Sequence, residues 1–363
     1  MPFHEDGDRR MSRLTVFTLC SNNYLAYAKT LGESVVRHDP DARFVIGLVD
    51  ERRPDLDYSR VGPFEILQVE EIGIPDFEGF WKRYNLVELN TAVKPFYFEH
   101  FFRERRSDVV VFLDPDVEVY SSLQPVVESL GSAAVLLTPH ILTPIPVDGL
   151  SPAEPVFLRF GLYNLGFLAM AERQDAGAFL EWWKARTAAS GYDRPDEGLF
   201  VDQLWINLAP IFFNGIRIAR HAGLNVAYWN LHERRLSQTD DHRWLVNGSD
   251  PLVFFHFSQL DRKDAHSISK VKTRYHFGNR PDLRELVQGY REQLVRNEVD
   301  RFQGVPCAYE ERRLSSARDD RERSRRLRAR RSPISFLAGT LASRLLEAAT
   351  RTLQRFQARL AAR

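Results

Sequence analysis

The sequence predicts an α/β fold with a mostly parallel central sheet flanked by helices. Three observations support this fold class. Short apolar runs that are typical of strands alternate with helical patterns along the first half of the chain. One of these runs, 109–113, is continuously apolar, as in a strand that is covered on both faces. The 363 residues are 44% hydrophobic, which is ample for one large core of this kind.

The N-terminal elements follow the order strand, helix, strand. RLTVFTLCSN (13–22) predicts a first strand that ends in a polar loop. Residues 24–36 carry apolar side chains at helical spacing and end before the turn residues HDPDA. ARFVIGLVD (42–50) and FEILQVEEI (64–72) predict the next two strands. No Gly-x-Gly-x-x-Gly follows the first strand, so the pattern disfavours a dinucleotide cofactor.

Helical and strand patterns continue through the rest of the chain. YNLVELNTAVKPFYFEHFF (84–102) predicts a helix with Thr91 as its cap and Pro95 in its first turn. The segments after the apolar strand predict, in order, a short helix and a strand within 126–141, a strand in 160–171, an amphipathic helix in 175–190, a helix broken by Pro210 in 198–213, strands in 226–233 and 251–260, and a helix in 282–297.

Composition predicts four parts: a flexible N-terminus at 1–12, the α/β domain at 13–300, a basic linker at 301–332 and an amphipathic helix at 333–363. Fifteen arginines and six acidic residues lie between Glu310 and Arg363, which gives this tail a net charge of +9, while the whole chain carries +1. The last segment can lie on an anionic membrane, pair with a partner helix or pack on the domain. Its arginines are not interleaved with aromatic residues, so no nucleic-acid partner is expected.

The sequence also predicts where the protein resides. It has no run of 18 or more apolar residues, and its first ten residues lack the basic and then apolar pattern of a signal peptide. We therefore expect a cytoplasmic protein, which would be peripheral on the inner face of the membrane if the tail helix binds lipid. Cys20 and Cys307 have neither the spacing of a metal site nor that of a disulfide framework.

Two acidic residues directly follow the apolar strand in VVVFLDPDVEVY (109–120). Ligands of open α/β sheets bind beyond the carboxyl ends of the strands, where Asp114 and Asp116 lie. Two carboxylates beside a buried strand are unfavourable unless they are protonated or neutralised by a cation, and oxygen ligands suit Mg²⁺ or Mn²⁺. Asp-x-Asp alone is weak evidence, since it recurs at Asp55 and Asp57, and a solvated turn around Pro115 is the alternative.

Six segments stand in an order that is far more specific than any one of them. They are FTLCSNNYLAYAKTLGESV (17–35), TAVKP (91–95), FLDPDVEV (112–119), YNLGFLAM (163–170), FVDQLWIN (200–207) and FFHFSQ (254–259). In this order they resemble the GT-A glycosyltransferases related to glycogenin and the bacterial family 8 galactosyltransferases. The segments are similar to that family's nucleoside-binding loop, phosphate-contacting element, metal-binding Asp-x-Asp strand, Asn-x-Gly segment, Asp-Gln-x-x-x-Asn helix and late metal-binding His. The resemblance covers about residues 13–262.

This resemblance implies the GT-A fold, a nucleotide-diphosphate sugar as donor, and a glycan, lipid-linked glycan or protein as acceptor. It implies that Asp114, Asp116 and His256 hold Mn²⁺ or Mg²⁺. It places Asp202 and Gln203 nearest the anomeric carbon as the catalytic residues, and it implies net retention. The donor contacts that it implies are Thr18, Ser21, Asn22 and Tyr24 at the base and ribose, Lys94 at the phosphates, and Asn164 and Gly166 behind the sugar.

Alternatives remain open at the sequence level. An inverting enzyme would need a carboxylate base near the acceptor, and Glu197 or Asp202 could supply one. Gln259 stands where the family has glycine, and Arg262 and Lys263 are the cations that follow it. A sugar-nucleotide-binding or scaffold protein without catalytic activity is therefore the alternative function. A nucleotidyltransferase is disfavoured, because its glycine-rich loop with Arg and Lys is missing after the first strand.

Overall fold

A computed structural model describes residues 13–264, 266–270 and 274–330. The predicted flexible N-terminus (1–12) and the predicted amphipathic helix (333–363) lie outside the described residues. Close residue contacts divide the chain into two units, Met1–Glu311 and Arg312–Arg363. Each unit is considered by itself, and the candidate site belongs to the first.

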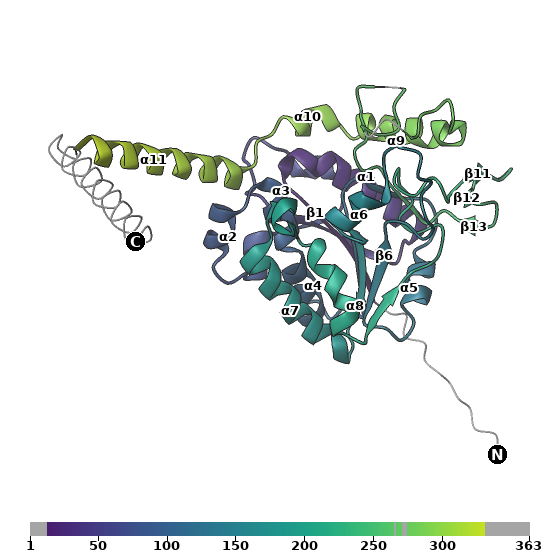
Figure 1. Cartoon of the computed structure of the whole chain (residues 1–363), viewed down its shortest axis with the longest axis horizontal. Coiled ribbons are helices and arrows are strands. Elements are labelled where there is room, and N and C mark those ends of the chain that lie inside the picture. The colour runs from purple at the N-terminus through teal and green to yellow at the C-terminus, as the bar shows by residue number, and fades with distance from the viewer. Residues whose placement is uncertain (1–12, 265, 271–273, 331–363) are drawn as a thin grey trace, which may run out of the picture. The chain divides into compact units, whose positions relative to one another are not determined.

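A seven-stranded sheet forms the centre of the first unit (Figure 1). Its strands are β1 (Leu14–Cys20), β2 (Arg43–Leu48), β3 (Glu65–Gln68), β4 (Val109–Leu113), β6 (Val135–Pro139), β7 (Tyr163–Ala171) and β10 (Ile216–Ile218). They are ordered β10-β6-β7-β4-β1-β2-β3, and all neighbouring pairs are parallel except those of β7, which runs antiparallel to both β4 and β6. The predicted α/β fold with a mostly parallel central sheet is therefore confirmed.

Short antiparallel pairs lie outside the central sheet. β5 (Val117–Val119) pairs with β14 (Phe254–His256), and β8 (Asp193–Arg194) pairs with β9 (Leu199–Phe200). A separate three-stranded sheet consists of β11 (Leu236–Gln238), β12 (Trp244–Val246) and β13 (Asp250–Pro251).

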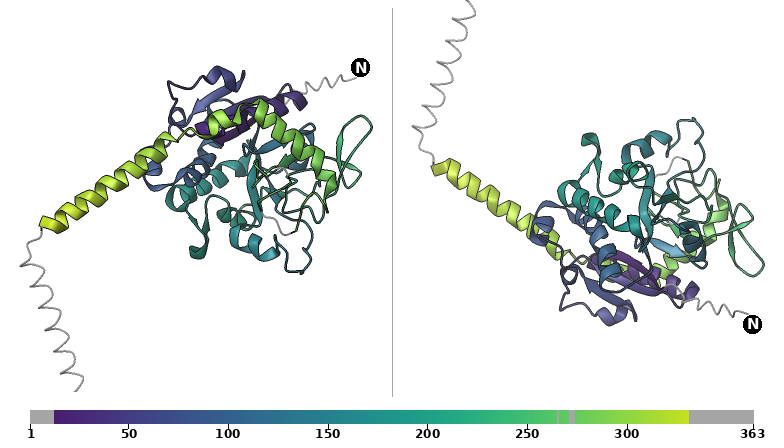
Figure 2. Two further views of the ribbon diagram at one scale, coloured as in Figure 1. Left: turned by 90° about the horizontal axis from the view of Figure 1, so that it is seen from above. Right: turned by 90° about the horizontal axis from the view of Figure 1, so that it is seen from below.

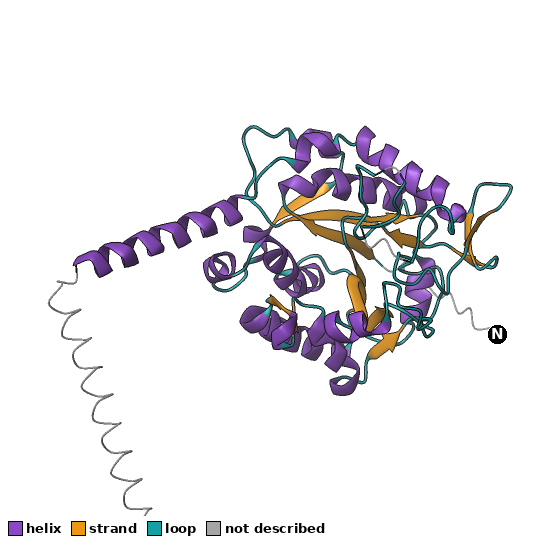
Figure 3. Cartoon of the chain, turned by 45° about the horizontal axis from the view of Figure 1, so that its top comes forward, coloured by secondary structure: helices purple, strands orange, loops and turns teal. Residues whose placement is uncertain are grey.

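Helices cover both faces of the central sheet (Figure 3). The helices of the first unit are α1 (Leu25–His38), α2 (Phe77–Arg83), α3 (Leu86–Ala92), α4 (Lys94–Arg103), α5 (Gln124–Leu130), α6 (Glu154–Phe160), α7 (Gln174–Ser190), α8 (Ala209–Phe212), α9 (Arg284–Arg296) and α10 (Val299–Gln303). A further helix, α11 (Ala308–Arg330), begins in the first unit, and most of it belongs to the second. Among the residues that the structure describes, none of these helices has the length and apolarity needed to cross a membrane.

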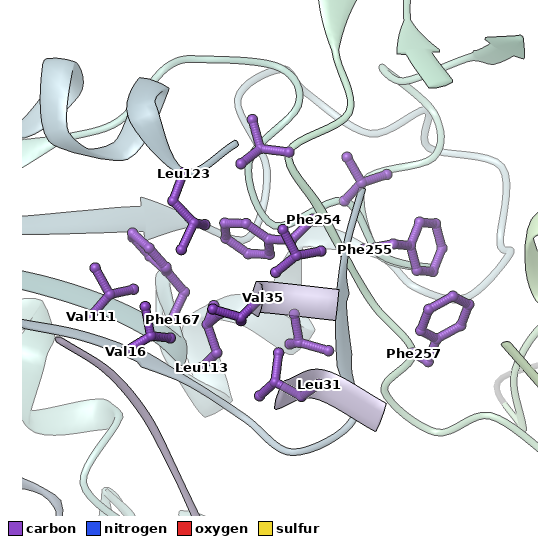
Figure 4. Packing of buried hydrophobic residues seen from close by; sticks show 14 of the residues in the cluster. Val16, Leu31, Val35, Val111, Leu113, Leu123, Phe167, Phe254, Phe255 and Phe257 are labelled. Carbon is purple, nitrogen blue, oxygen red and sulfur yellow. The ribbon is translucent and has the colours of Figure 1, made fainter. Parts of the chain in front are cut away.

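Each face of the sheet has its own core. On one face, Val16 and Val111 of the sheet pack with Leu31 and Val35 of α1 (Figure 4). The green α9 lies beside the purple α1 on this face (Figure 2). The other face is covered by α3, α4 and α7, and Phe98 and Phe101 of α4 pack with Phe17 of β1. Since both faces are covered, β4 at the centre of the sheet is buried along its whole length, as its apolar run predicts.

Three predictions of local structure are wrong. The predicted helix 198–213 consists of β9, a turn, a 3-10 helix (Leu204–Leu208) and α8, and Pro210 lies in the first turn of α8. The predicted strand 226–233 is a series of turns, because the Asn230 side chain hydrogen-bonds the backbone of the same segment at Ala227 N (3.0 Å).

The third wrong prediction concerns the cap at Thr91. Thr91 lies inside α3, where its hydroxyl donates to Val87 O at 3.0 Å. Asn85 caps α3 instead, since its Oδ1 accepts from Val87 N and Glu88 N at 3.0 Å each. Pro95 lies in the first turn of α4, as predicted.

Residues just after position 300 continue the first unit. Phe302, Cys307 and Tyr309 are buried, and both cysteines are free. Ala308 N donates to Asp50 Oδ1 at 2.8 Å, at the end of β2. The stretch predicted as a basic linker thus begins with residues that complete the core of the first unit.

Candidate functional site

Three predicted metal ligands meet at the carboxyl edge of the central sheet. Asp114 and Asp116 lie in the tight turn between β4 and β5. The pairing of β14 with β5 places His256 opposite Val117, directly after this turn. His256 Nε2 lies 3.0 Å from Asp116 Oδ1 and 3.8 Å from Asp114 Oδ2. One potential ligand atom of each residue lies within 4.8 Å of the others, so the three side chains can reach one ion.

Gly166 of β7 makes room for this cluster. Its carbonyl accepts a hydrogen bond of 2.8 Å from Asp114 N. A Cβ atom at this position would lie 2.3 Å from His256 Cε1 and 2.8 Å from Asp114 Oδ2, which is closer than side chains can pack. Glycine is therefore required for β7 to approach the three side chains.

The charges of the cluster are incompletely balanced. Burial raises the pKa of Asp114 to about 6; Asp116 and Asp202 add to the rise, while Lys94 and His256 oppose it. Burial would lower the pKa of His256, but the contacts with Asp116 and Asp114 outweigh it and raise the pKa. His256 Nδ1 has no hydrogen-bond partner among the described residues. Two carboxylates and one imidazole with spare coordinating atoms fit a divalent cation.

Lys94 and Asp202 form a buried ion pair beside the cluster. Lys94 Nζ lies 2.8 Å from Asp202 Oδ2, and the two side chains are 3% and 1% exposed. Lys94 Nζ also donates to Leu165 O at 2.9 Å and lies over the Phe112 ring. Burial raises the pKa of Asp202, and the Lys94 ammonium opposes that rise. The structure therefore commits Lys94, the predicted phosphate contact, to partners inside the protein.

Gln203 fixes the same part of β7 from the opposite side. Its Oε1 accepts from Leu165 N at 3.0 Å, and its Nε2 donates to Phe160 O at 2.8 Å. Lys94 binds the carbonyl of Leu165 while Gln203 binds its amide. The backbone between Asn164 and Gly166 is thus held by two side chains that were predicted to contact the donor.

A neutral hydrogen-bond network supports Asn164. Asn164 Oδ1 accepts from Gly166 N at 3.2 Å and from Asn225 Nδ2 at 3.0 Å. His140 Nδ1 lies 3.3 Å from the carbonyl oxygen of Leu162, which can only accept, so His140 Nε2 is the acceptor for Asn164 Nδ2. Burial lowers the pKa of His140 to about 4, and the charge of His256 adds to this effect. His140 is therefore neutral at neutral pH.

A cavity of about 250 Å³ adjoins the two aspartates. Its walls come from the end of β1 and the following loop, from one face of α3, and from the turn after β4. The lining residues are Leu19, Cys20, Ser21, Asn23, Tyr24, Leu86, Val87, Asn90, Thr91, Asp114, Pro115 and Asp116. Ser21 and Tyr24, which were predicted to contact a nucleoside, therefore share one cavity with the predicted metal ligands.

Thr18 and Asn22, also predicted as donor contacts, lie away from the cavity lining and are fully buried. Asn22 Nδ2 donates to Asp50 Oδ2 at 2.7 Å, and Asn22 Oδ1 accepts from Tyr58 OH at 2.7 Å. Ser21 Oγ donates to Val49 O at 3.1 Å. These bonds shape the loop after β1, so Asn22 supports the cavity through the backbone.

One face of α3 lines the cavity, although the sequence pattern was not interpreted in this way. Leu86, Val87, Asn90 and Thr91 line the cavity. Their spacing of four residues places them on one helical face, which was the available signal. Interpreting Thr91 as a cap concealed that face, because a cap would start a helix at the point where α3 ends.

Gln259 has the backbone conformation that glycine adopts readily. Its φ is +59°, in the left-handed region, and its side chain is exposed. The loop thus has a backbone conformation that glycine would also adopt at this position. Arg262 donates to Asp300 Oδ1 at 3.1 Å, and Lys263 is exposed.

No family model matches the chain. It is similar to two uncharacterized proteins of Bacillus subtilis (strain 168). YfnF is 30% identical over 186 residues, which are 51% of this chain and 59% of YfnF, so the match spans less than two thirds of that relative. YfnD is 21% identical over 257 residues, which are 68% of this chain and 78% of YfnD.

Several solved glycosyltransferase structures show distant similarity. The galactosyltransferase LgtC, in complex with donor and acceptor sugar analogues, is 17% identical with a TM-score of 0.49, over 80% of this chain and 97% of the LgtC chain. The bifunctional glycosyltransferase WbbM is 16% identical with a TM-score of 0.45, over 84% and 52%. GlyE of Streptococcus pneumoniae TIGR4 is 13% identical with a TM-score of 0.42, over 82% and 66%. Identity and TM-scores at this level do not assign a family.

Proposed function

We propose that the chain is a metal-dependent GT-A glycosyltransferase that moves a sugar from a nucleotide-diphosphate donor to a glycan, lipid-linked glycan or protein, with net retention. One observation carries this proposal. Asp114 and Asp116, which meet His256, border a cavity whose remaining walls are the end of β1, the loop after it and α3. The six sequence segments thus meet at one edge of the sheet, where an α/β protein binds its ligands.

The charge of the cavity supports a bound cation. None of the described residues that line it is a lysine or an arginine, and Lys94 is paired with Asp202. A diphosphate entering this cavity would therefore meet two acids without a cation from the chain. Mn²⁺ or Mg²⁺ held by Asp114, Asp116 and His256 would neutralise the diphosphate and the charge that develops as the sugar leaves.

The chain's own residues would hold and orient the donor. Ser21, Asn23 and Tyr24 would contact the base and ribose, and Asn164 and Gly166 would lie behind the sugar. Asp202 and Gln203 would act next to the anomeric carbon, in part through the Leu165 backbone that Lys94 and Gln203 hold. The acceptor oxygen bonds to the anomeric carbon as that carbon's bond to the diphosphate breaks, and the hydroxyl proton passes to the released nucleotide diphosphate.

The ion pair of Asp202 supports retention. An inverting enzyme needs a free carboxylate base near the acceptor. Asp202 is 1% exposed and paired with Lys94, so it is unsuited to that role. Glu197, the other candidate base, has a 60% exposed side chain and pairs with Arg194 at 3.4 Å.

The basic tail supports a peripheral position at the inner face of a membrane. Residues 310–363 carry the net positive charge, which would be attracted to anionic lipid headgroups. Such a position would bring the site close to a lipid-linked acceptor.

A thermal-shift screen of nucleotide sugars with and without Mn²⁺ tests the proposal, because a ligand that binds only the native state raises its stability. We expect one donor to stabilise the wild type only with Mn²⁺ and to release its nucleotide diphosphate slowly into water. Asp114→Asn removes a metal ligand. It should therefore lower the apparent affinity for the donor and the rate of nucleotide release by about 100-fold or more.

The matched control is Asp55→Asn, in another Asp-x-Asp sequence, where Asp55 is exposed and pairs with Arg53 at 3.2 Å. It should leave both effects unchanged. Binding of a donor without any turnover would support the non-catalytic sugar-nucleotide-binding alternative. No response to any nucleotide sugar would contradict both functions.

A further inference from the structure

A second cavity, of about 420 Å³, lies between α6, the end of β6 and the end of β10. Its walls are mainly apolar, and three of its side chains are exposed although they are apolar: Leu158 (72%), Leu162 (43%) and Ile218 (39%). Exposed apolar side chains gathered around one hollow indicate a binding site rather than scattered surface residues.

This cavity lies at the same edge of the sheet as the cluster of Asp114. β6 and β10 end here and β7 begins here, while β4 on the other side of β7 delivers Asp114. The sheet order therefore puts the nucleotide cavity at β1 and β4 and the apolar cavity at β6 and β10, with β7 between them. A molecule in the apolar cavity approaches the cluster from the side opposite the nucleotide.

Three ring contacts connect the cavity wall to the cluster. Phe157, which lines the cavity, stacks on His140 with centroids 5.1 Å apart. His140 contacts Trp229 at 5.2 Å, and Trp229 contacts His256 at 5.2 Å. The apolar wall and the cluster are thus joined by one continuous set of packed rings.

A positively charged side chain borders this cavity. Arg220 lines it and is exposed, and none of the described residues pairs with its guanidinium. Arg220 also lines the adjacent hollow together with Arg217. An apolar cavity with an arginine at its rim complements a molecule that joins an aliphatic chain to a phosphate.

The walls fit the other acceptor classes less well. The two aromatic rings of the lining, Phe157 and Tyr163, are 6% and 8% exposed, so they offer no open face on which a free sugar could stack. Among the described residues of the lining, the carboxylate of Glu154 already accepts from Ile145 N at 3.1 Å. Few polar groups remain to bind a peptide backbone.

We propose that this cavity binds the aliphatic and phosphate portion of an amphiphilic sugar acceptor whose hydroxyl reaches Asp114, Asp116 and His256. The inference rests on the proposed function and selects the lipid-linked class among its acceptors. The aliphatic portion would contact the apolar walls, and the phosphate would lie at Arg220.

Calorimetric titration with decyl phosphate, below its micelle concentration, tests this site on the full chain. Decyl phosphate should bind the wild type, while inorganic phosphate should not. Leu158→Asp should weaken binding by about tenfold, because it replaces apolar contact with a charge that repels the phosphate. Arg220→Gln should weaken it about fivefold. Val295→Asp changes an equally apolar, 65% exposed side chain on α9 and should have no effect.

Competition with transfer connects the site to the reaction. Decyl phosphate should slow transfer to a membrane-extracted acceptor and leave Mn²⁺-dependent donor binding by the wild type unchanged. The proposal would be overturned if decyl phosphate did not bind, or if it bound all variants as tightly as the wild type. It would also be overturned if decyl maltoside bound as tightly as decyl phosphate. If decyl phosphate follows the variants but no nucleotide sugar binds, the cavity assignment stands and the glycosyltransferase function falls.

Discussion

Two sets of charged side chains lie at the carboxyl edge of the sheet: Asp202 with Lys94, and Asp114 and Asp116 with His256. Within the protein, only the first set contains a full counter-charge for its acid. Asp202 has the ammonium of Lys94 at 2.8 Å, and both side chains are almost fully buried. Among the described residues, Asp114 and Asp116 share His256 as their ion-pair partner, at 3.8 and 3.0 Å, and they border an open cavity. The comparison shows that one charge set is complete within the fold, while the other is left for a ligand to complete.

The largest expected effect comes from removing one charge of the ion pair between Lys94 and Asp202. Asp202→Asn leaves the Lys94 ammonium buried without a counter-charge. We expect the free energy of unfolding to fall by about 3–5 kcal/mol, as measured for buried pairs that lose one partner. Urea unfolding monitored by circular dichroism measures the change.

Two further variants separate pairing from polarity. Lys94→Met combined with Asp202→Leu removes both charges and should recover most of the lost stability. Asp196→Asn removes the acid of an exposed pair with Arg159, whose atoms lie 2.6 Å apart, and should change stability by less than about 1 kcal/mol. A loss for Asp202→Asn as small as that of Asp196→Asn would contradict a structural role for the pair.

A second pair of buried groups sharpens the comparison. His256 lies beside two acids and has a raised pKa, whereas the described contacts of the His140 ring are with Asn164, Leu162 and aromatic rings, and burial lowers its pKa to about 4. The unfolded chain binds a proton at His140 below pH 6.5, and the folded protein does not until about pH 4. Stability is therefore lost as the pH falls through this window, by about 2 kcal/mol at pH 5.

Urea unfolding at pH 7 and pH 5 checks this dependence. His140→Gln should reduce the loss between the two pH values, even if it lowers stability at both. His276→Gln, at an exposed histidine, should leave the loss unchanged. An unchanged pH dependence in His140→Gln would show that His140 is protonated in the folded protein.

The sequence predicted the parts of this edge that depend on local pattern. The apolar run of β4, the helix spacing of α1 and α7, and the position of Asp114 and Asp116 after β4 follow from periodicity. The direction of β7 does not, since all nine of its residues are buried and such a run looks the same in either direction. Periodicity also failed in 226–233, where Asn230 bonds the local backbone and replaces strand pairing with turns.

Pairings between distant residues were beyond the sequence pattern. Lys94 sits at the start of a helix, where a phosphate is a reasonable partner, yet its charge is used by Asp202, which lies far along the chain. The ion pair between Lys94 and Asp202 also explains why the helix that was predicted around position 202 does not form. Asp202 and Gln203 must point toward Lys94 and Leu165, and Val201 adopts a φ of +42°, so a continuous helix cannot form there.

A substitution at Gly166 would disturb the cluster of Asp114, Asp116 and His256 without changing any of these predicted metal ligands. In Gly166→Ala, the new Cβ would lie 2.3 Å from His256 Cε1, so the cluster must shift. We expect a loss of about 2 kcal/mol in the free energy of unfolding, typical of overpacking, together with a weaker thermal stabilisation by Mn²⁺.

Gly177→Ala provides the matched control, because a Cβ in that position of α7 meets nothing within 4 Å. It should raise stability by up to about 1 kcal/mol, since alanine favours the helix. Normal Mn²⁺ stabilisation in Gly166→Ala would show that the close approach of β7 is unrelated to metal binding.

The smallest expected effect concerns the loop that follows His256. Gln259 is the departure from the family pattern that favoured a non-catalytic protein, but its φ of +59° means that the loop keeps the conformation of a glycine. Gln259→Gly should raise the free energy of unfolding by about 0.5–1 kcal/mol, because relief of the left-handed strain exceeds the extra entropy of the unfolded chain. Gln288→Gly, in the helix α9, should lower it by about 1 kcal/mol. Mn²⁺-dependent donor binding should be the same in Gln259→Gly and the wild type, since the loop shape does not change. A large gain of donor binding in Gln259→Gly would instead mean that glutamine distorts the incomplete charge set, and that the wild-type site is degenerate.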